Sequence, residues 1–118
     1  MSRTRASAKA AGTRFESQIA AYLAEHVDDR IERRAKAGAK DRGDVSGVRH
    51  RGQRVVIECK NTTRMALGSW IREAEAEQGN DGAHIAVVAH KRHGVGAAGE
   101  QLVTMTLENF AKLLDGTA

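Results

Sequence analysis

Cysteine is nearly absent from the sequence and proline is entirely absent: the 118 residues include one cysteine, Cys59, and no proline. A single cysteine cannot form an internal disulfide, which suits a reducing compartment, so we expect a cytoplasmic protein. No spacing of cysteine and histidine residues resembles a zinc site. Residues 1–14 contain basic side chains but no apolar stretch, so we expect no secretory signal there.

Long apolar runs and aromatic side chains are also scarce. No apolar run approaches the roughly 18 residues that a transmembrane helix needs, so we expect no contact with a membrane. The aromatic residues are only Phe15, Tyr22, Trp70 and Phe110. They are too few for a platform on which the bases of single-stranded nucleic acid stack. The chain length suffices for one domain with a modest core.

Basic residues are concentrated in two blocks. Residues 1–14 contain four cations and no acid, and residues 30–54 contain nine cations and three acids, although the net formal charge is only +4. Clusters of this kind are typical of proteins that bind polyanions, and a basic surface that only aids solubility is the alternative. We therefore expect contacts with DNA phosphates from the following residues of the two blocks: Arg3, Arg5, Lys9, Lys36, Lys40, Arg42 and Arg51.

The hydrophobic pattern predicts alternating helices and strands. We expect a flexible basic arm over residues 1–11, then a helix that Thr13 caps and that ends near residues 26–28. Strands are predicted at 30–34, 44–50, 54–60, 84–90 and 102–107. Further helices are predicted at 67–78, with Ser69 as cap and Gly79 as stop, and at 107–116.

The order of these elements predicts the fold class. The strand–helix–strand segment 54–90 favours a parallel pair of strands joined by a helical crossover. The whole order predicts an α/β sandwich in which helices flank a mixed central sheet of about five strands. We expect residues 12–118 to form this single domain.

Two charged residues, Glu58 and Lys60, lie within the apolar strand predicted at 54–60. Charges in such a place cost several kcal/mol unless they are paired or bind a metal. Residues two apart in a strand share a face, so Glu58 and Lys60 lie on the face of Val56. A three-residue turn at 51–53 would bring Asp44 to this face, whereas a two-residue turn would place it on the Cys59 face. We expect the three-residue turn.

Two converging carboxylates and a lysine suit the chemistry of a divalent metal. The carboxylates repel each other unless a cation neutralises them, and oxygen ligands select Mg²⁺ or Mn²⁺. Asp44, Glu58 and the backbone carbonyl of Cys59 would bind the ion, and Lys60 would orient water or offset charge in the transition state. This is the chemistry of phosphodiester hydrolysis. The alternatives are a surface ion pair for Glu58 and Lys60 and a turn residue for Asp44.

The sequence GD at 43–44 followed by IECK at 57–60 resembles the motif of the PD-(D/E)XK nuclease superfamily. Asp44, Glu58 and Lys60 occupy its three motif positions, and Gly43 stands where the motif has proline. The segment GTRFESQIAAYLAEH is similar to the first helix of archaeal-type Holliday junction resolvases, whose glutamate joins the metal site. This resemblance implies a metal-site role for Glu16, for which helix capping is the alternative.

The similarity continues through the basic approach AKAGAKDRGDVSG and through ECKNTTRMALGSWIREAEAEQ. It implies a supporting role in the site for Gln78, which could also simply end its helix. The resemblance covers about residues 12–90, and it is to short phage-encoded resolvases in particular.

The resemblance implies a restriction-endonuclease-like fold and an activity. The expected activity is that of a Mg²⁺-dependent endonuclease, with Mn²⁺ as a substitute, that resolves four-way DNA junctions. The resemblance points to a homodimer, in the host cytoplasm if phage-encoded, without fixing its interface. We expect the interface around Trp70 and Ile71 or over 102–114, and a monomer is the alternative. Two alternatives remain open: a general or repair-type nicking nuclease of the same fold, and a basic DNA-binding accessory protein with a dead site.

Overall fold

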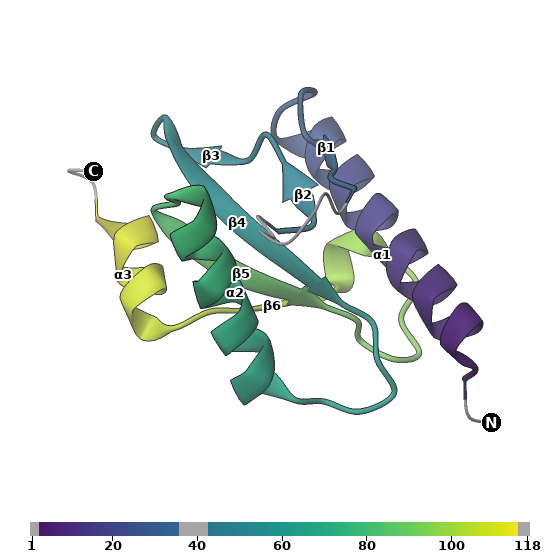
Figure 1. Ribbon diagram of the computed structural model, residues 1–118. Coiled ribbons are helices and arrows are strands. Elements are labelled where there is room, and N and C mark those ends of the chain that lie inside the picture. The colour runs from purple at the N-terminus through teal and green to yellow at the C-terminus, as the bar shows by residue number, and fades with distance from the viewer. Residues whose placement is uncertain (1–2, 36–42, 116–118) are drawn as a thin grey trace.

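The computed structural model describes residues 3–35 and 43–115, which fold as an α/β protein (Figure 1). A mixed four-stranded sheet has the strand order β3–β4–β5–β6. Its strands are β3 (Arg49–His50), β4 (Gln53–Lys60), β5 (Ile85–His90) and β6 (Leu102–Thr104). Strands β1 (Glu32–Arg33) and β2 (Val45–Ser46) form a separate antiparallel pair. The predicted α/β class and mixed sheet are confirmed, although the main sheet has four strands rather than about five.

The parallel pair of β4 and β5 forms the centre of the sheet. The pair is in continuous register from Val55 with Ile85 to Lys60 with His90. Helix α2 (Leu67–Asp81) connects the two strands, which confirms the predicted crossover between parallel strands. All residues of β5 are buried, as expected for a parallel strand covered on both faces.

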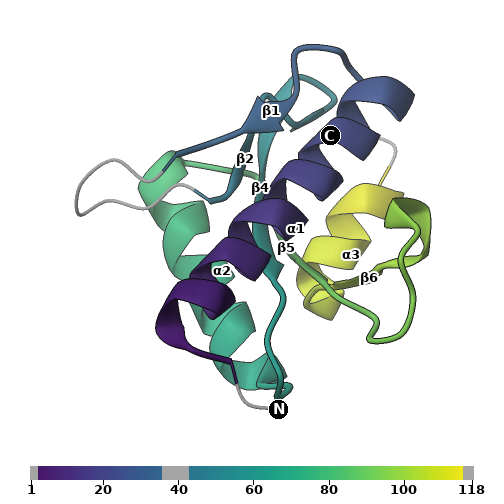
Figure 2. The same ribbon diagram turned by 90° about the vertical axis from the view of Figure 1, so that its right-hand side faces the viewer.

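Helices α1 (Arg5–His26) and α2 cover opposite faces of this pair (Figures 1 and 2). Ile57 and Cys59 pack on the α1 side in one core cluster, and Val56 packs with Trp70 in a second cluster on the α2 side. The alternation predicted for the strand is therefore confirmed, because Glu58 and Lys60 share the face of Val56. The 3₁₀ helix η1 (Ala98–Glu100) and helix α3 (Leu107–Leu114) complete the described fold.

Helix α1 begins at Arg5, much earlier than predicted. Its cap is Thr4, whose hydroxyl accepts a hydrogen bond from the backbone N–H of Ser7 at 3.0 Å. The expected arm and the cap at Thr13 are therefore wrong, because residues 5–11 are helical. The physical reason is the high helix propensity of the alanines in RASAKAA, which lets the helix extend through the basic segment. The predicted end near His26 is confirmed.

Helix α2 also has different ends from those predicted. Ala66 is its N-cap, and Ser69 lies inside the first turn, where its hydroxyl donates to the carbonyl of Ala66 at 3.0 Å. The helix continues past Gly79 to Asp81, and its C-cap Gly82 adopts the left-handed conformation with φ of 61°. A glycine in this conformation is a common helix stop, so the second of two available glycines ends α2.

The β3–β4 hairpin has a two-residue turn, so the predicted three-residue turn at 51–53 is wrong. The register pairs His50 with Gln53, and the turn residues Arg51 and Gly52 have φ of 53° and 79°. Positive φ at both central positions is typical of a type I′ turn, whose twist matches that of the paired strands. Arg51 therefore adopts a left-handed conformation, which arginine rarely takes and which no local pattern predicted.

Gly47 divides the strand that was predicted over 44–50. Its φ is 83°, and a Cβ atom there would lie only 2.8 Å from the carbonyl oxygen of Arg30. The chain on its N-terminal side pairs with β1, through Ser46 and Glu32, while the chain beyond it forms β3. The strand predicted at 30–34, observed as β1, therefore belongs to the small sheet and not to the main one.

Candidate active site

Asp44 lies against the end of β4 even though the hairpin turn differs from the prediction. Its backbone N–H donates to the carbonyl of Ile57 at 2.9 Å, and its carboxylate Oδ2 accepts from the N–H of Cys59 at 2.7 Å. Nearer the turn, the N–H of Val55 donates to the carbonyl of Val48. The segment from Asp44 to Val48 is therefore two residues longer than the facing segment of β4 from Val55 to Ile57. The extra residues form a bulge around Gly47. This irregularity, rather than the predicted register, brings Asp44 to the motif residues of β4.

Glu58 is buried beside two other acids. Burial raises the pKa of Glu58 far above the usual range, and a hydrogen bond with Asp44 and the negative charges of Asp44 and Glu77 raise it further. All three residues are buried. We call Asp44, Glu58 and Glu77 the acidic cluster. The carboxylates of this cluster repel one another, so without a cation Glu58 retains a proton at neutral pH.

Lys60 is the cation nearest to Glu58 among the described ion pairs. Its Nζ lies 3.9 Å from Oε2 of Glu58 and donates a hydrogen bond to Oε2 of Glu73 at 2.6 Å. Burial by itself would lower the pKa of Lys60, but the hydrogen bond to Glu73 and the negative charge of Glu73 outweigh it and raise the pKa. The lysine is therefore held in its charged form between β4 and α2.

Helix α2 supplies two acids that the sequence patterns had not singled out. Glu73 and Glu77 are four residues apart, which places them on one side of the helix. The buried residues of α2 are Trp70, Ala74, Glu77 and Asp81. A search for this stripe at helical spacing would have found Glu77, because an acid there replaces an apolar residue that faces the sheet.

Glu16 lies on the other side of β4. It is in the middle of α1, so the alternative role as a helix cap does not apply. Its Oε1 accepts a hydrogen bond from Nε of Arg33 at 3.1 Å. Burial raises the pKa of the Cys59 thiol, and the charges of Asp44 and Glu16 add to this effect. Glu16 is thus near Cys59, on the α1 side, whereas the acids that raise the pKa of Glu58 are Asp44 and Glu77.

Gln78 does not join the acidic cluster. Its Nε2 donates to the carbonyl of His84 at 3.1 Å and to Oδ1 of Asn109 at 3.3 Å. These bonds connect the end of α2 with α3 and the start of β5. The structure therefore places Gln78 in a structural position, and the acid that approaches Glu58 from α2 is its neighbour Glu77.

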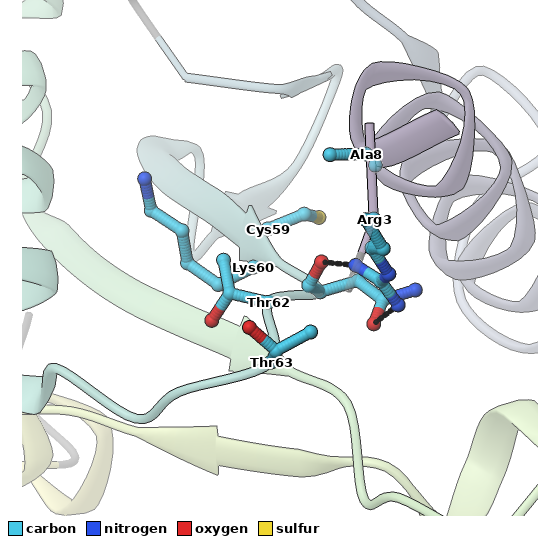
Figure 3. Close-up of a pocket in the computed structure, with 8 residues that line it drawn as sticks. Arg3, Ala8, Cys59, Lys60, Thr62 and Thr63 are labelled. Carbon is cyan, nitrogen blue, oxygen red and sulfur yellow. Dashed lines mark hydrogen bonds between the residues drawn. The ribbon is translucent and has the colours of Figure 1, made fainter. Parts of the chain in front are cut away.

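Cys59 combines a core side chain with a backbone that faces Asp44. Its side chain is buried in the α1-side cluster, and Figure 3 shows Cys59 and Lys60 pointing to opposite sides of the strand. The N–H of Cys59 is directed at Asp44. Since N–H and C=O of one strand residue point to the same edge, the carbonyl of Cys59 is also directed toward this edge.

The donor set of this region fits a hard divalent cation. Among residues 3–35 and 43–115, no three Asp, Glu, His or Cys side chains are already arranged to hold a metal ion. Mg²⁺ keeps several of its waters, however, so two carboxylates and a backbone carbonyl can suffice. The three buried carboxylates of the acidic cluster exceed what Lys60 can neutralise, and Lys60 is shared with Glu73.

The predicted phosphate contacts are distributed over the two ends of β4. Arg5 and Lys9 are exposed in the first turns of α1, and Arg51 is exposed in the β3–β4 turn. Arg3 donates to Asn61, which follows β4. Because β4 spans eight residues, Arg3 and Arg51 are separated by a strand length of about 26 Å. Lys36, Lys40 and Arg42 lie outside the described residues.

Comparison with protein-family models, with curated proteins and with solved structures finds no match to this chain. None of the described helices is both long and apolar enough to cross a membrane. What the protein does must therefore be inferred from its own residues.

Proposed function

We propose that this protein is a Mg²⁺-dependent, structure-selective DNA endonuclease that resolves four-way junctions on a restriction-endonuclease-like fold. The observation that carries the proposal is the meeting of Asp44, Glu58 and Lys60 at the end of β4. The same three residues have the order and type of the PD-(D/E)XK motif. Asp44 and Glu58 are buried and Lys60 is only partly exposed, which argues against the alternative of a solvated surface ion pair.

Each residue would have a distinct task. Asp44, Glu58 and the carbonyl of Cys59 would hold the divalent ion, with Glu77 adding negative charge behind them. When bound, Mg²⁺ or Mn²⁺ would supply charge neutralisation and polarise a phosphate oxygen. Lys60, kept charged by Glu73, would offset the negative charge that develops on the phosphate during hydrolysis. Glu16 would support the site from the α1 side through its bond to Arg33.

A homodimer would supply the two active sites that paired cleavage of a junction needs. The junction is nearly two-fold symmetric, and a two-fold dimer matches it. Trp70 is 7% exposed and belongs to the core, so it is a poor interface residue. The segment 102–114 instead exposes a set of large apolar side chains: Leu102, Val103, Leu107, Phe110 and Leu114. We therefore propose the β6–α3 surface, defined by these five residues, as the interface.

The experiment that tests this function is nicking of a labelled synthetic four-way junction, compared with a linear duplex of the same sequence. We expect Mg²⁺- or Mn²⁺-dependent nicks on opposed strands of the junction and no nicking in a chelator. Nicking should be weaker in Ca²⁺, whose looser coordination positions water poorly. Equal cleavage of both substrates would favour a general nicking nuclease. Binding without any nicking would favour the accessory protein.

Two substitutions connect the activity with the site. Asp44→Asn and Glu58→Gln should each reduce nicking by about a hundredfold or more, because each replaces a negatively charged metal ligand with a neutral amide. Junction binding should stay close to that of the parent, because neither variant removes a cation. Glu108→Gln is the matched control, since Glu108 is an exposed acid on α3. A comparable loss of nicking in the control would contradict the assignment.

A further inference from the structure

A pocket of about 490 Å³ opens where β4 ends beside α1 (Figure 3). Its volume is in the range of roughly 300–1,000 Å³ that small-ligand sites occupy. It is lined by Arg3, Ala8, Gly12 and residues 59–63. Arg3 supplies the cation of this lining and Thr62 and Thr63 supply hydroxyls, whereas the ammonium of Lys60 points to the α2 side, where it bonds Glu73. None of the lining residues is acidic. The charge of the pocket therefore complements an anion.

The guanidinium of Arg3 is held in place at this pocket. Its Nη1 donates to the backbone carbonyl of Asn61 at 2.7 Å and its Nη2 approaches Oδ1 of the same residue at 3.3 Å; Figure 3 draws both bonds. An arginine has five N–H donors, so two bonds to Asn61 leave donors for a ligand. A cation that is already oriented loses less conformational freedom when it binds an anion.

The pocket adjoins the proposed catalytic residues along the chain. Lys60 belongs to both, and Asn61, Thr62 and Thr63 follow it directly. Thr62 donates its hydroxyl proton to the carbonyl of Arg64 at 2.5 Å, which leaves Thr63 as the hydroxyl donor of the pocket. The residues opposite, Ala8 and Gly12, are small, so α1 allows a bulky group to approach.

We infer that this pocket binds a backbone phosphodiester of DNA, next along the same strand to the phosphate that the acidic cluster and Lys60 would cut. Arg3 is its cation and Thr63 a further donor. The inference rests on the proposed nuclease function and adds a positioning site to it: the pocket sets which phosphate of the strand enters the acidic cluster.

The test combines substitutions in the chain with neutral linkages in the DNA. The cleavage position is first mapped from the product length, and a single uncharged methylphosphonate is then placed one linkage to either side. In the parent protein, one of these two substrates should be nicked about tenfold more slowly at low DNA concentration. Arg3→Gln should nick normal DNA about tenfold more slowly than the parent does. It should nick that modified substrate no more slowly than it nicks normal DNA.

Two further variants keep the test specific. Arg5→Gln removes a nearby exposed cation that does not line the pocket, and it should remain as sensitive to the neutral linkage as the parent. Thr63→Val keeps the bonds between Arg3 and Asn61, so its expected loss of about threefold cannot come from disturbing them. Thermal melting of each variant checks that the fold is retained.

The outcomes for the pocket and for the nuclease are separable. If the parent cuts DNA and Arg3→Gln is as sensitive to the neutral linkage as the parent, the pocket assignment is overturned and the nuclease stands. If the parent cuts nothing, the nuclease proposal fails, and the linkage scan is repeated as a binding measurement by fluorescence anisotropy. The pocket assignment is then supported if a neutral linkage at one position weakens binding by the parent but not by Arg3→Gln. It is overturned if the neutral linkage affects both proteins equally at every position.

Discussion

Glu58 is the residue whose charge depends most on its surroundings. Its burial with Asp44 and Glu77 raises its pKa, so the folded protein without metal holds a proton that the unfolded chain loses above pH of about 4.5. The protonated form thus contributes stability that is complete below this pH. That contribution is lost progressively as the pH rises toward the higher pKa of the folded state.

We therefore expect the free energy of unfolding of the metal-free protein to fall as the pH rises from about 5 to 8, measured by urea denaturation in a chelator. Glu58→Gln should flatten this dependence, because the amide does not titrate. The exposed control Glu108→Gln should leave the slope as in the parent. An identical slope in the parent and in Glu58→Gln would show that Glu58 is not the titrating group.

The same proton connects metal binding with pH. A cation at the acidic cluster stabilises the carboxylate, so binding of Mg²⁺ should release a proton and should strengthen with increasing pH. Calorimetric titration with Mg²⁺ in buffers of different ionisation enthalpy measures this release directly. We expect close to one proton per ion for the parent and almost none for Glu58→Gln. Binding that is independent of the buffer would contradict the proposed site.

The residues of the site were predictable to the extent that strand geometry determines them. Glu58 and Lys60 share a face because they are two apart in a strand, and this needed no knowledge of the fold. The role of Gln78 was inferred from a resemblance, and the structure places its neighbour Glu77 in the cluster instead. A difference of one position turns a helix side chain by about 100°, and the phase of α2 is determined by the packing of Trp70 and Ala74 on the sheet.

At the scale of the elements, Gly47 has the largest effect on the site. It ends β2, approaches the backbone of Arg30 and lies beside the two extra residues that carry Asp44 to the end of β4. The sequence could not show this, because a glycine between two short apolar runs is compatible with one continuous strand. Strand type and order followed from local patterns, whereas the break depends on a contact with residues far away in the chain.

Gly47→Ala should lower the free energy of unfolding by about 3 kcal/mol, measured by urea denaturation. A left-handed alanine costs about 1–2 kcal/mol, and its Cβ would also meet the carbonyl of Arg30. Gly52→Ala is the matched control, since Gly52 has φ of 79° but nothing within 4 Å of the added atom. We expect it to cost only about 1 kcal/mol. Equal costs for the two variants would mean that the contact with Arg30 is not tight.

At the scale of the whole molecule, the β6–α3 surface is the feature that a single chain does not explain. Leu107, Phe110 and Leu114 recur at helical spacing on α3 with exposures of 80%, 45% and 70%. Strand β6 is at the end of the sheet order, so one of its edges has no partner among the described strands. An apolar helix stripe beside a strand edge is the kind of surface that a second copy of the chain would cover.

The double variant Leu107→Ser/Leu114→Ser should shift the protein from dimer to monomer at micromolar concentration, measured by analytical ultracentrifugation. Apolar burial drives such interfaces, and both side chains lie largely outside the monomer's core. Val27→Ser is the control, because Val27 is 63% exposed at the far end of α1, outside this surface. A parent that sediments as a monomer, both free and on a junction, would remove the paired-cleavage mechanism and favour the simple nicking nuclease.

The hydrogen bond from the N–H of Cys59 to the carboxylate of Asp44 has a practical consequence for anyone who needs an inactive form of this protein, for instance to trap a substrate. The Asp44 side chain that would bind the ion also accepts the hydrogen bond of a backbone N–H of β4. Alanine at this position would remove both functions and leave a buried N–H without its acceptor. Asparagine keeps an acceptor oxygen in place, so the uncut complex can be captured on an intact scaffold.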